Sequence, residues 1–453
     1  MAVGFWVRRG VAALAVALCL SGAAQAQEVR LTLPEARGTA ARFLANGRPE
    51  VALKLAEGVL LGAPQDHFAL LIKARALRDL GYPVEAGKAA RVAWQISDTD
   101  QEKFYAALVV AQAKATQGRK LAAQLWLRRA SQAAPDDRLK QTAMRDFRQV
   151  RAATPTRLRF DLSLTPSDNL NDAPTSDTLY RGPFSSPLAQ PLSGVRLQFG
   201  AQVTHRIALG ENARVNLGAQ YAMTRVRLSS EAQSIDPAAE NSDFALDVFG
   251  LSLGYEQRGA AGDWLGSLRL TQLRTLSTGE ALSDVTQLDG RFGYSLAPGL
   301  NGTVSASYSH EAWLGSGTTV DTRTLGLSLE KRLPAGVWRF GLSMRDVMSD
   351  NTAIARDVRR ADLSYATAKP VMGALPRVTL SYERAEYDTA WTPIWTDPRQ
   401  DETWTLGLDV TLPKLDYYGF APEIGVSFRD RRSNYVPYET QGTNLHLGLK
   451  SVF

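Results

Sequence analysis

The sequence contains very little cysteine and histidine, and this scarcity excludes several kinds of chemistry. One cysteine, Cys19, and four histidines are spread over 453 residues (the histidines are His67, His205, His310 and His446). A disulfide framework, a catalytic thiol and a zinc site with regularly spaced ligands are therefore excluded. The glycine-rich nucleotide motifs and the Gly-x-Ser-x-Gly motif are also missing. We expect no cofactor, no metal and no enzymatic activity.

One group of serine and histidine residues could in principle form a catalytic site. Ser307, Ser309 and His310 are close in sequence, as a nucleophile and its base would be. They fall in a segment that we predict to be a β-strand, where adjacent side chains point to opposite faces. We therefore do not assign them a catalytic role.

Long apolar runs are missing everywhere except near the N-terminus. The mean hydropathy is −0.20, which excludes a bundle of membrane-spanning helices. The one apolar run, Gly10 to Leu20, follows Arg8-Arg9 and leads into small residues that end at Ala26. This pattern is typical of a cleaved secretory signal, with a retained anchor as the alternative, because the run is too short to cross a bilayer. We predict a signal peptide at residues 1–26, which would also remove Cys19.

Residues 27–153 have the pattern of an alanine-rich helical domain. Glycine and proline interrupt the helical period at regular intervals, as expected of short connections between helices (Gly47-Arg48-Pro49, Pro64, Gly81-Tyr82-Pro83, Gly118-Arg119 and Pro135). Alanines recur 34 residues apart in the first two units, and three residues later than that in the third (Ala40, Ala74 and Ala111; Ala52, Ala86 and Ala123). A plain helical bundle with chance spacing is the alternative interpretation.

This period resembles that of tetratricopeptide repeats, in which helix–turn–helix units stack through small residues. The resemblance predicts three units with a capping helix over residues 136–153. In such arrays the first helix of each unit lines a concave groove. The groove would then bind an extended peptide through seven residues, although Phe68 and Leu71 could instead pack between units (the seven are Phe68, Leu71, Arg75, Arg78, Tyr105, Leu108 and Gln112).

From Thr156 onward the hydrophobic period becomes two, which is typical of β-strands with one apolar face. Val195, Leu197 and Phe199 alternate with polar residues, for example. We predict about fourteen strands over residues 154–453, near 156–165, 192–207, 212–228, 243–257, 263–276, 284–296, 299–311, 319–332, 336–348, 356–368, 375–387, 400–412, 421–431 and 442–453.

Three features favour a transmembrane barrel over a soluble β-domain. Most predicted strands have ten residues or more, which suits tilted strands that cross a membrane. Short connections such as Gly210-Glu211 alternate with longer polar ones such as 166–191, as in bacterial outer-membrane barrels. Phe453, which ends the last strand, resembles the assembly signal of these barrels. Aromatic residues near strand ends fit the two interfacial girdles, although several could instead pack in loops (Trp264, Trp313, Trp338, Trp404 and Tyr435).

The fold class predicted is therefore an α-helical array followed by an antiparallel transmembrane β-barrel of about fourteen strands. The barrel would lie in the bacterial outer membrane, with the helical domain in the periplasm, because an even number of strands places both barrel ends on one side. Outer-membrane lipid and lipopolysaccharide are then expected partners.

Basic residues dominate the stretch from 101 to 151, where eleven Lys and Arg outnumber four acids. A solvated helical face is the simplest interpretation. A nucleic-acid partner is excluded for an exported protein. An acidic segment of a secreted client, or anionic lipid headgroups, remains compatible with this charge.

The order of signal, repeats and barrel resembles the surface lipoprotein assembly modulator (Slam) family. The similarity is concentrated in residues 164–173, where Pro166, Ser167, Asn169 and Asn171 match a family stretch, and in residues 428–453. The resemblance implies a translocator that helps a secreted lipoprotein, or a related haem- or metal-acquisition client protein, to reach the cell surface. It also implies assembly by the barrel assembly machinery. A porin or an exopolysaccharide export channel with a repeat domain is the alternative.

Overall fold

The structure, a computed structural model, describes residues 31–174, 190–390 and 396–451. The predicted signal peptide (residues 1–26) and Phe453 lie outside these ranges. The chain divides into two compact units, with the boundary between Gln117 and Gly118. Within the described ranges, no helix combines the length and the apolar character needed to cross a membrane.

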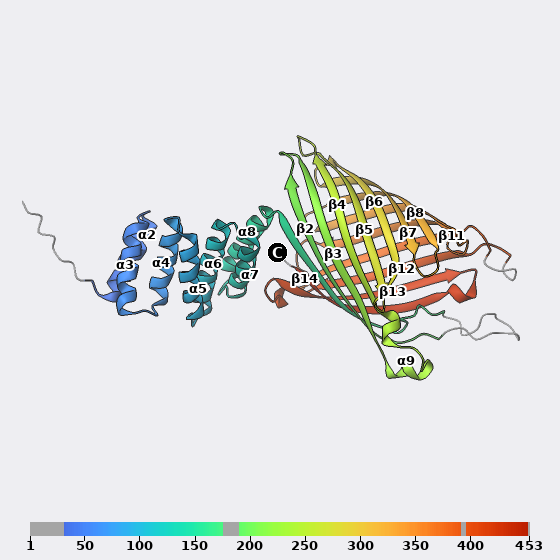
Figure 1. Cartoon of the computed structure of the whole chain (residues 1–453), viewed down its shortest axis with the longest axis horizontal. Helices are drawn as coiled ribbons and strands as arrows, with labels where there is room; N and C mark the ends of the chain where they lie inside the picture. The colour runs from blue at the N-terminus through green and yellow to red at the C-terminus, as the bar shows by residue number, and fades with distance from the viewer. Residues whose placement is uncertain (1–30, 175–189, 391–395, 452–453) are drawn as a thin grey trace, which may run out of the picture. The chain divides into compact units, whose positions relative to one another are not determined.

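The first unit is an array of helices that pack in chain order (Figure 1). They are α2 (Leu33–Ala45), α3 (Pro49–Gly62), α4 (His67–Asp79), α5 (Pro83–Gln95) and α6 (Asp100–Thr116). Proline begins α3 and α5, where its missing N–H costs nothing. Asp66 and Thr99 cap α4 and α6 by accepting hydrogen bonds from backbone N–H groups. The breaks before α3, α4 and α5 therefore fall where the glycine and proline pattern predicts them, whereas the break before α6 contains neither residue.

The small residues that define the repeat lie at the helix contacts. All six alanines named for the period are at most 1% exposed. Helices α2 and α4 are neighbours, as are α4 and α6, so that the first helices of successive units lie side by side. Alanine allows this close approach because its side chain adds almost no distance between the backbones.

The second unit begins with two helices, α7 (Lys120–Gln132) and α8 (Asp137–Ala152), which pack against each other. Helix α7 is the second helix of the third predicted repeat, and α8 is the predicted capping helix. Lys120 Nζ donates a hydrogen bond of 2.7 Å to the Ala153 carbonyl, and Gln124 donates one of 2.9 Å to Thr154 Oγ1. These bonds fix the α7–α8 hairpin to the segment that leads into the first strand.

Fourteen antiparallel strands then close into a barrel, in which each strand pairs with its neighbours in sequence and β1 pairs with β14. The strands are β1 (Thr156–Ser167), β2 (Gly194–Ala208), β3 (Ala213–Leu228), β4 (Leu246–Arg258), β5 (Trp264–Ser277), β6 (Glu280–Ala297), β7 (Leu300–Trp313), β8 (Thr319–Arg332), β9 (Gly336–Ser349), β10 (Arg356–Thr367), β11 (Leu375–Tyr387), β12 (Gln400–Thr411), β13 (Phe420–Ser433) and β14 (Thr440–Ser451). The predicted helical array and the fourteen-stranded barrel are confirmed.

The two ends of the barrel differ in their connections. At the end where β1 begins, which we call the helix end, most connections are short turns such as Leu209 to Asn212, but residues 368–374 and 412–419 form longer ones. At the opposite end, the loop end, longer segments follow β1 and β3, and the second of these carries the short helix α9 (Ser230–Ile235) (Figure 1). The alternation is not complete, because β5 and β6 are joined at the loop end by Thr278-Gly279 alone. Both residues have positive φ, as a tight hairpin turn requires.

The outer surface of the barrel is an apolar band. Leu, Phe and Val side chains of neighbouring strands lie in register and are exposed, for example Phe160, Leu406 and Phe428. Aromatic pairs border the band on both sides. Trp264–Phe292 and Trp338–Tyr365 lie toward the helix end, and Tyr221–Phe249 and Tyr382–Trp404 lie toward the loop end. The prediction of girdles holds for Trp264, Trp338 and Trp404.

Two of the predicted girdle residues do not belong to this surface. Tyr435 is 1% exposed, and its hydroxyl donates a hydrogen bond of 2.7 Å to the Asp397 carbonyl. Trp313, at the end of β7, shares the parity of the residues that face the barrel interior. Tyr435 therefore packs within the loops, which was the alternative for these aromatic residues, and Trp313 lacks the outward parity of the girdles.

Candidate functional site

Among the described residues, the seam between β1 and β14 has the shortest register of the barrel's pairings. Its register consists of Ser163↔Gly448, Leu164↔Leu447 and Ser167↔Asn444. The neighbouring pairing of β13 with β14 runs without a break from Phe420↔Ser451 to Arg431↔Thr440. Among the described residues, the register gives β1 no β14 partner before Ser163, although β1 pairs along its whole length with β2.

The predicted family motif forms the exit from β1 at the loop end of this seam. Asn169 closes a turn, because its side-chain oxygen accepts from Ala173 N (2.7 Å) and its amide donates to the Ala173 carbonyl (2.8 Å). Asn171 accepts from Leu192 N (2.9 Å) and donates to the Gln190 carbonyl (2.9 Å). Ser167 accepts from Asn169 N (3.2 Å) and Pro166 lies within β1, paired with Val195. The asparagines therefore organise the loop through backbone groups.

Leu170, between the two asparagines, anchors the same loop in an apolar cluster with Leu192, Val226 and Leu228. Gly194 leaves the space for it. A Cβ at Gly194 would lie 2.7 Å from Leu170 Cδ1 and 2.4 Å from the Arg227 carbonyl oxygen. The exit loop of β1 is therefore held by both polar and apolar contacts.

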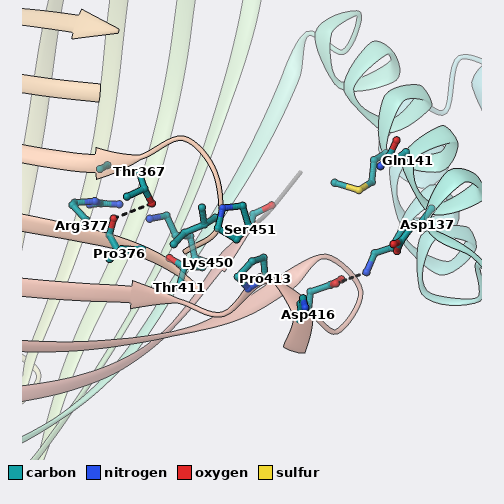
Figure 2. Close-up of a pocket in the computed structure, with 16 residues that line it drawn as sticks. Asp137, Gln141, Thr367, Pro376, Arg377, Thr411, Pro413, Asp416, Lys450 and Ser451 are labelled. Carbon is teal, nitrogen blue, oxygen red and sulfur yellow. Dashed lines mark hydrogen bonds and ion pairs between the residues drawn. The ribbon is translucent and has the colours of Figure 1, made fainter. Parts of the chain in front are cut away.

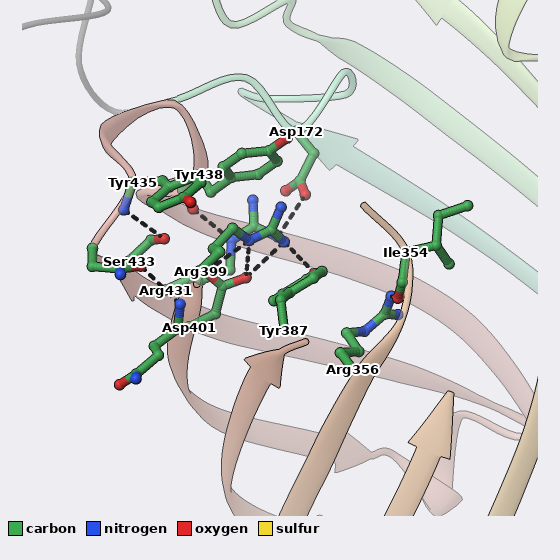
Figure 3. Close-up of polar contacts among 12 residues, drawn as sticks. Asp172, Ile354, Arg356, Tyr387, Arg399, Asp401, Arg431, Ser433, Tyr435 and Tyr438 are labelled. Carbon is green, nitrogen blue, oxygen red and sulfur yellow. Dashed lines mark hydrogen bonds and ion pairs between the residues drawn. The ribbon is translucent and has the colours of Figure 1, made fainter. Parts of the chain in front are cut away.

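This loop also reaches across β14 to β13. Asp172 forms ion pairs with Arg431 (3.4 Å) and Arg429 (3.7 Å), and Figure 3 shows the pair with Arg431. The two stretches that carried the family resemblance, 164–173 and 428–453, thus meet at one place. We call the contact of Asp172 with Arg429 and Arg431 the seam latch.

Beside the seam latch, Arg399 is enclosed between two aromatic rings (Figure 3). Its guanidinium carbon lies 3.9 Å from the Tyr387 ring centre and 3.5 Å from that of Tyr438, and it forms an ion pair of 2.8 Å with Asp401. The side chains of Arg399 and Asp401 are only 12% and 7% exposed. Arg431 Nε donates to the Tyr438 carbonyl (2.7 Å). This cluster joins the loop ends of β11, β12 and β13 into one unit.

Neither Arg399 nor Tyr387 stood out in the sequence. A single arginine near a strand end is ordinary in a barrel, and its partners come from other hairpins. Only the closing of the barrel brings these side chains together.

At the helix end, the α7–α8 hairpin holds the turn that precedes β13. Arg128 donates to the Tyr418 carbonyl (2.7 Å) and to Ser451 Oγ (3.1 Å), and its guanidinium lies over the ring of Phe420 at 4.4 Å. Burial, followed by the charge of Arg151, lowers the pKa of Arg128 to about 10. The hairpin is therefore attached both to β13 and to β14, one of the two strands of the seam.

A cavity of about 910 Å³ lies between α8 and the turns of β10–β13 (Figure 2). Its apolar wall includes Met144, Leu375 and Pro413. Its polar wall includes the Lys140–Asp416 ion pair and, from the barrel interior, Arg377 and Lys450. The cavity therefore leads from the helical hairpin toward the interior of the barrel.

The structure separates the residues predicted for the peptide groove. Phe68, Arg75 and Tyr105 are exposed on α4 and α6, whereas Leu71 is 9% exposed and packs within the array. Leu108 is partly buried. Arg78 donates a hydrogen bond to Gln112, which ties α4 to α6. Whether the exposed members bind a peptide stays a prediction.

The residues considered for catalysis lie apart. Ser307 and Ser309 face the barrel interior, whereas His310 faces outward, where it contacts Asp321 at 2.9 Å. The parity of the strand thus separates them, as the sequence argument expected. In the part of the chain that the structure describes, no group of three or more His, Cys, Asp or Glu side chains is placed to hold a metal ion.

Comparison with known families identifies the last five strands. Residues 350–453 match the surface lipoprotein assembly modifier family. This stretch contains β10 to β14, and with them Arg399, Asp401, Arg429 and Arg431. The resemblance to the surface lipoprotein assembly family is confirmed over this region. No curated protein matches the chain.

Solved structures resemble parts of the chain. The first tetratricopeptide domain of the human RPAP3 protein is 13% identical, with 27% of this chain and 93% of that chain covered and a TM-score of 0.24. A bacterial polysaccharide outer membrane secretin is 11% identical (65% and 98% covered, TM-score 0.33). OmpF of Salmonella typhi is 10% identical (65% and 97% covered, TM-score 0.36).

The barrel itself shows where the protein resides. A closed antiparallel barrel with an even number of strands, an apolar outer band and aromatic borders is the architecture of bacterial outer-membrane proteins. Closure satisfies the backbone groups that lipid cannot hydrogen-bond. The protein is an outer-membrane barrel whose residues 350–453 match the surface lipoprotein assembly modifier family.

Proposed function

We propose that this protein is an outer-membrane translocator that helps to deliver a surface lipoprotein, or a related secreted client, to the cell surface. The observation that carries the proposal is the family match over residues 350–453, which contains one whole side of the β1–β14 seam. The proposal assigns the chain no catalytic role and no nucleic-acid partner. It places the helical domain in the periplasm, because both ends of a barrel with an even strand number lie on one side.

The short register of the seam supports a lateral route for the client. Separating two strands breaks their backbone hydrogen bonds, each of which is worth about 1 kcal/mol net in water and more where lipid offers no replacement. A seam with few pairs opens at a lower cost than its neighbours. The seam latch would then hold the loop end closed until a client arrives.

The cavity beside α8 supports a path from the α7–α8 hairpin to the barrel interior. Its apolar residues can cover an extended segment of a client, and its basic residues lead into the barrel interior. The periplasm holds no nucleotide to drive transport. Folding of the client on the outer side would supply the direction.

The test is deletion of the gene followed by protease treatment of intact cells. We expect surface exposure of the client to fall while its total amount in the cell stays constant, and a plasmid copy of the full chain to restore exposure. The surface exposure of all secreted lipoproteins and haem-binding proteins of the cell should be measured in the same experiment. Unchanged exposure of all of them would refute the proposal.

A passive channel or a polymer exporter is the second candidate. It is favoured by the exposure of side chains that face the barrel interior, since Arg159 is 72% and Asp161 60% exposed. This function predicts a large, steady conductance of the purified protein in a planar bilayer, or loss of an exopolysaccharide on deletion. A silent bilayer recording together with lost client exposure would favour the translocator.

A further inference from the structure

Three arginines of neighbouring strands form a cluster inside the barrel near its helix end. Arg157 on β1 shares the inward parity of Ser163 and Ser167, and Arg206 on β2 and Arg214 on β3 share it through the register. Arg157 pairs with Thr204 and Arg206 with Asn216, so that successive arginines are diagonal neighbours. Diagonal neighbours in antiparallel strands lie about 7–8 Å apart. We call these three residues the lumenal arginine cluster.

The cluster contains more positive charge than its surroundings neutralise. Glu256 is the carboxylate among these residues, and it is already bound by Arg214 and by the Asn216 amide (2.6 Å). Of the described residues, none forms an ion pair or a side-chain hydrogen bond with Arg206. Arg157 Nε is buried without a hydrogen-bond partner among them. An unsatisfied guanidinium donor is costly unless a ligand completes it.

The inner wall of the barrel beside the cluster also carries positively charged side chains. Arg258, Arg269 and Arg291 also face the interior on β4 to β6, together with the acids Glu256 and Asp289. Like charges on adjacent strands destabilise a sheet. The position is also one that a passing segment would meet first, because Arg157 follows the start of β1 by one residue.

We propose that the lumenal arginine cluster binds the carboxylates of an acidic, extended segment of the client as it enters the barrel. The inference rests on the proposed function. Guanidinium groups bind carboxylates through two parallel hydrogen bonds. Side chains on one face of an extended peptide repeat every two residues, about 6.8 Å. This spacing agrees with that of diagonal arginines, so that acidic residues at alternate positions would meet successive members of the cluster.

The test measures peptide binding to the full-length protein in detergent by fluorescence anisotropy. The probes are two labelled peptides of equal length, one of alternating Glu and Ser and one of alternating Lys and Ser. We expect the Glu peptide to bind and the Lys peptide not to bind. The double variant Arg157→Gln/Arg206→Gln should weaken binding of the Glu peptide at least tenfold, and Arg157→Lys/Arg206→Lys should restore most of it.

The matched control is Arg227→Gln/Arg359→Gln, which removes the same charge from the outward side of β3 and β10. It should leave the affinity within about twofold of the wild type. Folding of every variant is checked by the heat-dependent shift in electrophoretic mobility that intact barrels show. Equal binding of both peptides, an unaffected double variant, or tighter binding of a polyphosphate of equal charge would overturn the proposal.

The deletion experiment and the peptide-binding experiment together distinguish an error in this inference from an error in the proposed function. If deletion abolishes client exposure but peptide binding does not depend on Arg157 and Arg206, only the inference is wrong. If binding depends on these arginines but deletion leaves every client exposed, the translocator function is wrong and the cluster serves an anion channel instead.

Discussion

Asp172, in the loop that leaves β1, lies 3.4 Å from the guanidinium of Arg431 on β13, with β14 between the two strands. The contact spans the place where the barrel closes. It connects the first strand to the last hairpin of the chain, and so it restrains the seam without belonging to the seam's own ladder.

Locking the seam is expected to stop client delivery. Ser163→Cys/Gly448→Cys places two cysteines at paired positions, and the mature chain predicted here has no other cysteine. We expect surface exposure of the client to be lost under oxidising conditions and to return with a reductant. Ser381→Cys/Thr405→Cys, a pair in the continuous β11–β12 ladder, is the control and should have no effect. Delivery through an oxidised seam would exclude a lateral route.

The loop beyond β1 should depend more on Asn171 than on Asp172. Asn171→Ala removes two hydrogen bonds to backbone groups, each worth about 1 kcal/mol. Asp172→Asn removes ion pairs of a half-exposed carboxylate, which are typically worth less than about 1 kcal/mol. The temperature of the electrophoretic mobility shift should therefore fall further for Asn171→Ala. The reverse order would show that the seam latch, and not the loop, stabilises this end of the barrel.

Arg128 is expected to control the attachment of the α7–α8 hairpin to the barrel. Arg128→Ala removes hydrogen bonds to Tyr418 and Ser451, at a cost on the order of 2 kcal/mol. Hydrogen exchange followed by mass spectrometry should show faster exchange in α8 and in the turn at residues 416–420. Arg138→Ala, on the surface of α8, serves as the control. Unchanged exchange in both segments would mean that other contacts hold the hairpin.

Two residues of α4 should separate packing from binding in the predicted groove. Leu71 is buried, so Leu71→Ala should destabilise the helical array by about 2–5 kcal/mol. Phe68 is exposed, so Phe68→Ala should leave stability nearly unchanged but weaken capture of the client in a pull-down. Thermal unfolding followed by circular dichroism gives the stability. If Phe68→Ala leaves capture intact, the exposed face of α4 is not part of the groove.

The N-terminus of α6 should respond to acid. Hydrogen bonds from the backbone N–H of Thr99 and then of Asp98 hold the pKa of Glu102 below its ordinary value of 4.5. A lowered pKa in the folded state means that this stabilisation is complete above pH 4.5 and is lost as the pH falls through the lower value. Exchange at the first amides of α6 should therefore accelerate in that window. Glu102→Gln should remove this part of the pH dependence, and persistence of the same acid response would assign it to another group.

The sequence by itself determined the elements of this protein. Alanines such as Ala52 and Ala86, at a fixed period, located the helix contacts, because only small residues allow backbones to approach. The alternation at Val195, Leu197 and Phe199 located strands and their apolar face, because side chains alternate across a strand. Most breaks between helices followed from glycine and proline, whose backbone preferences are local. For these reasons fold class and strand number could be predicted from short windows of sequence.

Only the tertiary structure decided how the ends of the chain meet. Three contacts join residues that are far apart in sequence. Asp172 pairs with Arg431, Arg399 lies between Tyr387 and Tyr438, and Arg128 donates a hydrogen bond to the turn before β13. Their positions depend on the tilt and register that all fourteen strands accumulate before the barrel closes. A local sequence pattern contains no information about this accumulated tilt and register. The seam and the seam latch can therefore be identified only in the closed barrel.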